Sequence, residues 1–280
     1  ELYHRDNAKI SVFDSGFLLG DGVWEGIRLH KSTLVFIEEH LNRLFNSASG
    51  ISLNIPFSKK DIVNQINKVL LKNKMEDDVH IRLIVSRGDK ITPYQNPNSN
   101  VGPVNYVIIP EFKKTDPITY QKGISIGRVS TIRPSHEVLS THYNTLSKLN
   151  CILASIEANK LGFDEGIMND PYDYISTCNS TNLFFIKNNI VWTSKGDYCL
   201  NGITRGKAIS ICKKNNIPIE EKNFTFEEII DSDEAFVTGT FAGIIPVSTL
   251  ENRRLNSTKP SSLVSKIRSL YINLIKDYIK

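Results

Sequence analysis

Cysteine is scarce in this chain, and nothing in its spacing resembles a ligand set. The cysteines are far apart, with no Cys-x-x-Cys pair and no histidine at the spacing of a zinc ligand. This distribution argues against both a zinc site and a disulfide framework, so we expect reduced thiols and no metal site. The residues concerned are Cys151, Cys178, Cys199 and Cys212.

Long apolar runs are also missing. The longest are far shorter than the roughly 20 residues needed to span a bilayer, so no transmembrane helix is expected. The first residues, ELYHRDNAKISVFD, carry scattered charges and no apolar signal core. We therefore expect a cytoplasmic protein without a membrane partner.

No single sign of charge dominates. Lys and Arg number 34 against 30 acidic residues, and this net charge of +4 is spread along the whole length. Such a spread lacks the concentrated basic face of a nucleic-acid binder. The 40% of apolar and 23% of charged residues are typical of a globular chain.

A length of 280 residues favours two domains over one. The order of strand-like and helix-like patterns predicts an α+β fold, with a small domain over residues 1–118 and a larger one over 119–280. The polar segment around 113–123 has the composition of a linker, which places the boundary there.

Helical periodicity is clear in several places. The pattern predicts helices over 38–49, after Ser58, and over 261–279. It also predicts a long helix from Thr145 to Lys160, closed by Gly162. One face of that helix is apolar, and it carries Leu149, Ile152, Leu153 and Ile156.

Two segments have the features of a phosphate site. LNGITRGKAIS runs from a glycine-containing turn into a helix, where backbone N–H groups and the helix dipole favour an anion. VTGTFAG places two hydroxyls around Gly239, where a turn can present both N–H and O–H donors. Alone, each segment is a weak signal, because Gly and Thr at a turn or helix start usually serve only as caps.

The two segments belong to a longer ordered set. The set is FDSGFLLGDGVWEGIR, FIEEHLNRLFNSA, LGFDEGIMND, YISTCNSTNLFFIK, CLNGITR and DEAFVTGTFAGIIPV. In order and spacing, these segments resemble the fold-type IV pyridoxal-phosphate enzymes, which include branched-chain and D-amino-acid aminotransferases and aminodeoxychorismate lyase. The resemblance covers nearly the whole chain.

The resemblance implies a small α/β sandwich followed by a larger pseudo-barrel domain, with pyridoxal 5'-phosphate held between them. It also implies a homodimer that acts on an amino acid donor and a keto acid. Arg43 matches the arginine that contacts the cofactor phosphate. Ile203 and Thr204 match the backbone cradle, and Thr240, beside Gly239, matches the hydroxyl that binds the phosphate.

The chain departs from the family at the lysine that binds the cofactor covalently. That lysine lies ahead of a Glu-Ala pair, here Glu157-Ala158, and the matching position is Asn144. The nearest lysine is Lys148, which would be the i+4 neighbour of Asn144 if the helix began before it. Lys148 is therefore our candidate nucleophile. Two alternatives stay open: a solvated lysine in a catalytically silent relative, and an engineered substitution at Asn144.

A second departure concerns the cofactor ring. Thr177 stands where the family has the glutamate that pairs with the pyridine nitrogen. A hydroxyl supplies no negative charge, so the ring would be a weaker electron sink. This favours lyase-type chemistry over transamination, although aminotransfer is the main activity of the family.

Substrate-side residues are less clear. The arginine and histidine that hold the carboxylate in D-amino-acid aminotransferases are replaced by Thr92 and Tyr94. His142 and Tyr143 could act as acid-base groups or could simply pack. The remaining candidates for a carboxylate partner are Arg28, Arg82, Arg87, Arg128 and Arg133.

These observations predict a pyridoxal-phosphate-dependent aminotransferase acting through a lysine imine. Two alternatives remain open, a lyase of the same family and a silent relative that binds a phosphorylated ligand.

Overall fold

The computed structural model describes residues 1–279. Its contacts divide the chain into two compact units, which are described separately. The first unit comprises residues 1–114 and 143–148, and the second comprises 115–142 and 149–280. The predicted boundary between residues 118 and 119 lies within α4 of the second unit.

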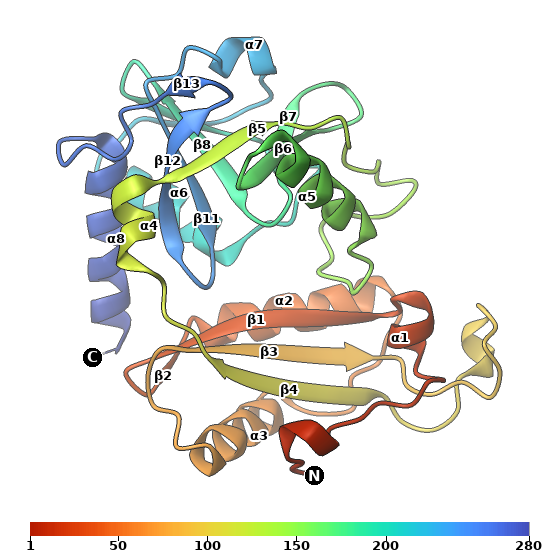
Figure 1. The fold of residues 1–280 in the computed structure, drawn as a ribbon. Helices are drawn as coiled ribbons and strands as arrows, with labels where there is room; N and C mark the ends of the chain where they lie inside the picture. The colour runs from red at the N-terminus through yellow and green to blue at the C-terminus, as the bar shows by residue number, and fades with distance from the viewer. Residues whose placement is uncertain (280) are drawn as a thin grey trace. The chain divides into compact units, whose positions relative to one another are not determined.

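A four-stranded antiparallel sheet in the order β2-β1-β3-β4 forms the first unit (Figure 1). Alternate residues of β1, among them Val23 and Ile27, point into a core that α2 and α3 cover. The elements are η1 (Arg5–Asn7), α1 (Ser15–Leu19), β1 (Gly22–His30), β2 (Thr33–Val35), α2 (Ile37–Gly50), α3 (Lys59–Lys72), β3 (Val79–Ser86), η2 (Pro97–Ser99) and β4 (Asn105–Phe112).

The predicted capping of α3 is confirmed. The Ser58 hydroxyl accepts from the Asp61 backbone N–H, and the Asp61 carboxylate accepts from the Ser58 N–H, which forms a capping box.

A curled nine-stranded sheet forms the second unit. Its strands run in the order β10-β9-β8-β11-β12-β5-β6-β7, and β13 pairs with β12. The elements are α4 (Pro117–Lys122), β5 (Ile124–Arg128), α5 (Leu149–Leu161), β6 (Glu165–Asn169), β7 (Ile175–Cys178), β8 (Asn182–Lys187), β9 (Ile190–Thr193), α6 (Ile203–Lys214), β10 (Ile219–Glu221), α7 (Phe226–Ile229), β11 (Glu234–Gly239), β12 (Gly243–Leu250), β13 (Arg253–Arg254) and α8 (Leu263–Ile279).

The prediction of a helix beginning at Thr145 is wrong. α5 begins at Leu149, because the preceding segment pairs with the edge of β1. The Trp24 N–H donates to the Asn144 carbonyl at 3.0 Å, and the Leu146 N–H donates to the Gly22 carbonyl at 2.9 Å. These bonds, with the bridge between Val23 and Thr145, pair the segment with β1 as a strand, so it is not helical here. α5 ends before Gly162, whose φ of 85° agrees with the predicted helix stop.

The predicted apolar face of α5 is exposed in this chain. The buried residues of the helix are Ala154 and Ala158, whereas Leu149 is 66% exposed and Ile152 52% exposed. None of the helices over residues 1–279 is both long enough and apolar enough to cross a bilayer.

Candidate active site

The amino terminus of α6 has no side-chain cap. Gly202 occupies the N-cap position and has no side chain, so the N-cap residue makes no side-chain hydrogen bond to the first turn, which includes Ile203 and Thr204. A glycine is needed here, because a Cβ at Gly202 would lie 2.1 Å from Asn182 Oδ1. This leaves a helix terminus whose donors and dipole suit an anion.

Asn182 holds the turn that leads into α6, and sequence reasoning did not single it out. It opens β8, is 9% exposed, and donates from Nδ2 to the Leu200 carbonyl at 2.9 Å. The signal available in the sequence was an asparagine at the start of an otherwise apolar buried strand. The amide of such a buried residue needs a hydrogen-bond partner, and here the partner lies in the turn before α6.

The hairpin between β11 and β12 carries the second predicted segment. Gly239 pairs with Gly243, so Thr240 lies in a three-residue turn. Gly243 has a φ of 70°, and a Cβ there would lie 2.7 Å from Tyr271 Cε1, so both backbone and packing require glycine. The buried hydroxyl Oγ1 of Thr238 has no hydrogen-bond partner among the described residues 1–279.

These two segments lie at the same end of neighbouring strands. Asn182, which contacts Gly202, pairs directly with Thr238 of β11. Gly239 is close to the neighbouring Thr181, since a Cβ built on it would lie 3.6 Å from Thr181 Cγ2. The structure therefore brings Ile203 and Thr204 close to the strand end that carries Gly239 and Thr240. The donor set fits a phosphate group: helix N–H groups with hydroxyls beside them.

Thr177 lies on β7 and is linked to the same region. Its Oγ1 donates to the Thr181 carbonyl at 2.8 Å, and Thr181 Oγ1 donates to Glu165 Oε2 at 3.0 Å. Burial raises the pKa of Glu165, although hydrogen bonds from Ser180 and Thr181 oppose that shift. Because the Thr177 proton is directed at a carbonyl, the hydroxyl oxygen remains an acceptor for another donor.

Asn144 and Lys148 lie in the first unit. Asn144 is 2% exposed, and its Nδ2 donates to the Trp24 carbonyl at 2.7 Å. The inference that a shared helix brings Lys148 to Asn144 is wrong, because neither residue is helical. The two side chains meet nonetheless, with Lys148 Nζ 3.1 Å from Asn144 Oδ1 and 5.7 Å from the centroid of the Trp24 ring.

Arg43 is paired with a fully buried carboxylate. Its Nε lies 2.7 Å from Glu25 Oε1 and its Nη2 lies 2.7 Å from Glu25 Oε2, while His40 Nδ1 lies 2.7 Å from Oε2. Burial alone would raise the pKa of Glu25, but the hydrogen bonds from Arg43 and His40 lower it below its usual value. This bidentate pair fixes the orientation of the guanidinium.

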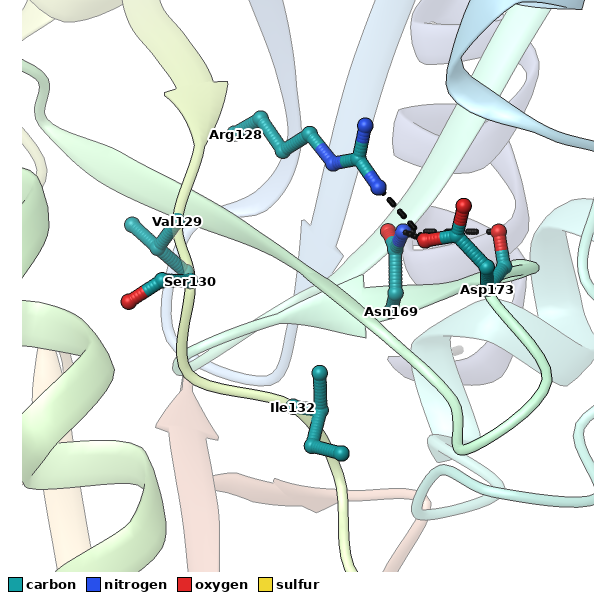
Figure 2. A pocket seen from close by; sticks show the side chains of 6 residues that line it. All are labelled: Arg128, Val129, Ser130, Ile132, Asn169 and Asp173. Atoms are coloured by element: carbon teal, nitrogen blue, oxygen red, sulfur yellow. Dashed lines mark hydrogen bonds and ion pairs between the residues drawn. The ribbon is translucent and has the colours of Figure 1, made fainter.

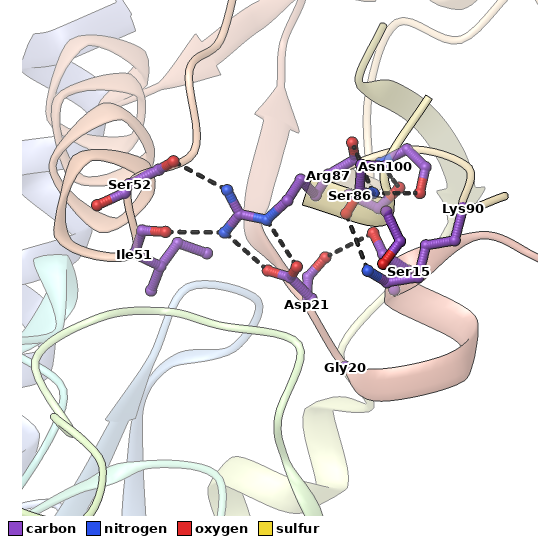
Figure 3. A network of polar contacts seen from close by, with 12 residues as sticks. Ser15, Gly20, Asp21, Ile51, Ser52, Ser86, Arg87, Lys90 and Asn100 are labelled. Carbon is purple, nitrogen blue, oxygen red and sulfur yellow. Dashed lines mark hydrogen bonds and ion pairs between the residues drawn. The ribbon is translucent and has the colours of Figure 1, made fainter. Parts of the chain in front are cut away.

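Arg87 has a structural role. It forms a bidentate pair with Asp21 at 2.7 and 3.0 Å and donates to the carbonyls of Ile51 and Ser52 (Figure 3). These contacts tie the end of α2 to the turn before β1, so Arg87 is a poor candidate for a carboxylate ligand.

Arg128 and Arg133 are likewise engaged within the second unit. Arg128 pairs with Asp173, and both residues line a pocket of about 390 Å³ (Figure 2). Arg133 donates to the Tyr198 carbonyl and to Asn150. Arg82 differs from both, because its guanidinium stacks over the Trp24 ring at 4.2 Å, on the residue that Lys148 also approaches.

His142 and Tyr143 have packing roles in this structure. His142 Nε2 lies 3.1 Å from the Gly196 carbonyl. Tyr143 packs against Gly50 so closely that a Cβ there would lie 2.2 Å from its ring. These contacts favour the structural alternative for both residues.

A family model described as "Amino-transferase class IV" matches residues 22–250. The chain belongs to this family. The class IV match covers both the Trp24 region and the β11–β12 hairpin, and it confirms the resemblance inferred from the sequence.

Curated proteins similar to this class IV chain are also named as aminotransferases or aminotransferase-like proteins. The chain is 36% identical over 98% of its length to branched-chain-amino-acid aminotransferase-like protein 2 of Arabidopsis thaliana. It spans about half of that relative, 49% of its length. It is also 29% identical to a D-alanine aminotransferase of Listeria monocytogenes, with 98% of this chain and 93% of that protein covered.

Solved structures of the family share the fold. A branched-chain aminotransferase from Escherichia coli is similar with a TM-score of 0.88 and 26% identity, covering 98% of this chain and 92% of that one. A branched-chain aminotransferase of T.th. in complex with N-(5'-phosphopyridoxyl)-L-glutamate gives a TM-score of 0.89 at 26% identity, with coverages of 98% and 91%. The predicted two-domain α+β fold of the class IV family is thereby confirmed.

Proposed function

We propose that this chain is a pyridoxal 5'-phosphate-dependent aminotransferase that moves an amino group between an amino acid and a keto acid. The observation that carries the proposal is the proximity of the uncapped α6 terminus to the Thr240 turn at one end of β8 and β11. The family match and the phosphopyridoxyl ligand of a similar structure support it.

In this proposal the cofactor phosphate is bound by the backbone of Ile203 and Thr204 and by the hydroxyl of Thr240, beside Gly239. Arg43 contributes positive charge from a guanidinium that Glu25 orients. The bound cofactor would supply an electron sink for the carbanion formed at the substrate α-carbon.

Lys148 is proposed to bind the cofactor covalently and to move the α-proton. Asn144, at the usual lysine position, accepts a hydrogen bond from Lys148 and orients its amine. Nearby Arg82 and the buried Trp24 Nε1 offer donors that suit a substrate carboxylate.

Absorbance and mass spectrometry test this assignment. Purified protein incubated with pyridoxal 5'-phosphate should acquire a visible absorption band, and borohydride reduction followed by tryptic digestion should place the modification on Lys148. Lys148→Ala should abolish both signals, whereas the exposed Lys160→Ala on α5 should retain them. Modification of another lysine would contradict the role of Lys148 but not the use of the cofactor.

Thr177 supports a second candidate, a lyase of the same family. Its hydroxyl donates to the Thr181 carbonyl and brings no negative charge to the ring nitrogen. Incubating the protein with a panel of amino acids and a keto acid separates the two candidates. An aminotransferase converts the keto acid into an amino acid, whereas a lyase releases an elimination product. Cofactor binding without either reaction would instead indicate the silent relative.

Homodimerisation also remains a proposal. The exposed apolar face of α5 supports it, because contiguous apolar surface on a helix is typical of an interaction surface.

A further inference from the structure

The turn Thr240–Ala242 is supported by few strand contacts of its own. The last pair of the β11–β12 ladder is Gly239 with Gly243, and the three residues of the turn extend beyond it. All three are half-buried. Their conformation therefore depends on what contacts the turn from elsewhere in the second unit.

Tyr120 makes such a contact from α4. Its hydroxyl donates to the Ala242 carbonyl at 2.7 Å, a distance typical of a good O–H···O hydrogen bond. Because a peptide group is planar, fixing the Ala242 carbonyl also fixes the orientation of the Gly243 N–H at the base of the turn.

Arg268 packs on the ring of Tyr120. The guanidinium carbon lies 3.8 Å from the centroid of the Tyr120 ring, within the range of a cation–π contact. Arg268 belongs to α8, and Tyr271 of the same helix packs under Gly243. The carboxy-terminal helix thus supports both the base and the tip of the hairpin.

We infer that Tyr120, backed by Arg268, is a positioning residue that sets the affinity of the Thr240 turn for the phosphate group of the cofactor. The inference rests on the proposed function. Tyr120 acts through the backbone of Ala242, so its removal should loosen the turn without removing any phosphate donor. The effect should appear only with ligands that carry a phosphate.

Two ligands isolate this effect. The dissociation constants of pyridoxal 5'-phosphate and of pyridoxal, which lacks the phosphate, are measured by fluorescence titration of the cofactor-free protein. Tyr120→Phe keeps the ring and removes the hydroxyl. We expect it to weaken pyridoxal 5'-phosphate binding about three- to tenfold, the range for one lost hydrogen bond, and to leave pyridoxal binding unchanged.

Control variants separate positioning from general damage. Tyr174→Phe, which removes an exposed hydroxyl of the same unit, should leave both constants unchanged. Arg268→Gln keeps the Tyr120 hydroxyl but removes the stacked cation, and we expect a smaller change in the same direction. If Tyr120→Phe does not fold, Arg268→Gln decides the question.

The outcomes distinguish the inference from the proposed function. Wild-type protein that binds neither ligand would overturn the proposed function. Wild-type protein that prefers the phosphorylated ligand, with the same preference in Tyr120→Phe and Arg268→Gln, would overturn only the positioning role. Equal weakening of both ligands would also overturn it, because that result indicates a loss of packing.

Discussion

Lys148 Nζ lies 3.1 Å from Asn144 Oδ1, so the lysine closest to the expected catalytic position is hydrogen-bonded to the residue that occupies it. The Asn144 side chain makes two hydrogen bonds. Its Oδ1 accepts from the Lys148 ammonium group. Its Nδ2 donates to the Trp24 carbonyl and links the segment to β1.

Replacement of Asn144 by alanine should destabilise the first unit. The substitution removes a buried hydrogen bond and leaves the Trp24 carbonyl without its side-chain donor, so we expect a loss of about 1–3 kcal/mol in the free energy of unfolding. Urea denaturation measures it. Ser147→Ala, which alters the same segment at an exposed site, should cost less than about 0.5 kcal/mol, and a similar cost for both would argue against an anchoring role.

Glu25→Gln should lower the stability of the folded protein more than most single substitutions do. It removes the charge that pairs with Arg43 and His40, and breaking one partner of a buried ion pair costs about 3 kcal/mol. Since the folded pKa of Glu25 is lowered, the stabilisation is present above its unfolded pKa and is lost as the pH falls through the folded value.

Denaturant unfolding at a series of pH values tests this expectation. The difference between wild type and Glu25→Gln should be largest near neutrality and should shrink in acid. Glu38→Gln, at an exposed position of α2, is the matched control, and a constant difference across the series would contradict the assignment.

His80 should make the protein sensitive to mild acid. Burial first, and then the cations Lys113 and Arg82, lower its pKa to about 4. The unfolded chain takes up a proton near pH 6.5 but the folded chain does not, so stability falls as the pH decreases from about 6.5 to about 4. His80→Gln should flatten the stability profile in this window, whereas His4→Gln, at an exposed site, should not change it.

Gly202 and Gly206 form a matched pair on α6. A Cβ at Gly202 meets Asn182 Oδ1 at 2.1 Å, while a Cβ at Gly206 meets nothing within 4 Å. Gly202→Ala should weaken pyridoxal 5'-phosphate binding by about tenfold, roughly 1.4 kcal/mol, because the turn must shift. Gly206→Ala should leave binding intact and stabilise the helix by about 0.5–1 kcal/mol. Equal affinities in a fluorescence titration would refute the role of the turn.

The exposed face of α5 predicts self-association. Ile152→Asp should convert a dimer into a monomer, as measured by light scattering coupled to size-exclusion chromatography, because a charge in an apolar contact is costly. Leu71→Asp on α3, at a position that is 81% exposed, is the control. A monomeric wild type would end the dimer proposal.

Local signals in the sequence predicted many of the elements. Ser58 with Asp61 marks the start of α3, and Gly162 marks the end of α5, because caps depend on neighbouring residues alone. The two segments that we propose for phosphate binding also carry local signals, since Gly202 and Gly239 each shape the backbone of the residues next to them.

Non-local pairing was not predictable in this way. The periodic apolar residues after Thr145 predict a helix, but Asn144 and Leu146 form backbone hydrogen bonds with β1. This pairing gives the segment a strand-like conformation, and the helix begins only at Leu149. The contacts of Asn182 and Tyr120 were not predictable from the sequence either. Each side chain bonds to a carbonyl in a distant segment, Leu200 and Ala242 respectively, and no local pattern reveals these partners.

The sequence by itself determined the family and the α+β class, and it predicted two segments for phosphate binding, because short-range periodicity, glycine placement and ordered motifs carry that information. Only the tertiary structure decided where α5 begins, that Lys148 meets Asn144 outside a helix, and that Arg43 is paired with a buried glutamate. These features depend on which distant groups share a hydrogen bond, and chain folding alone brings such groups together.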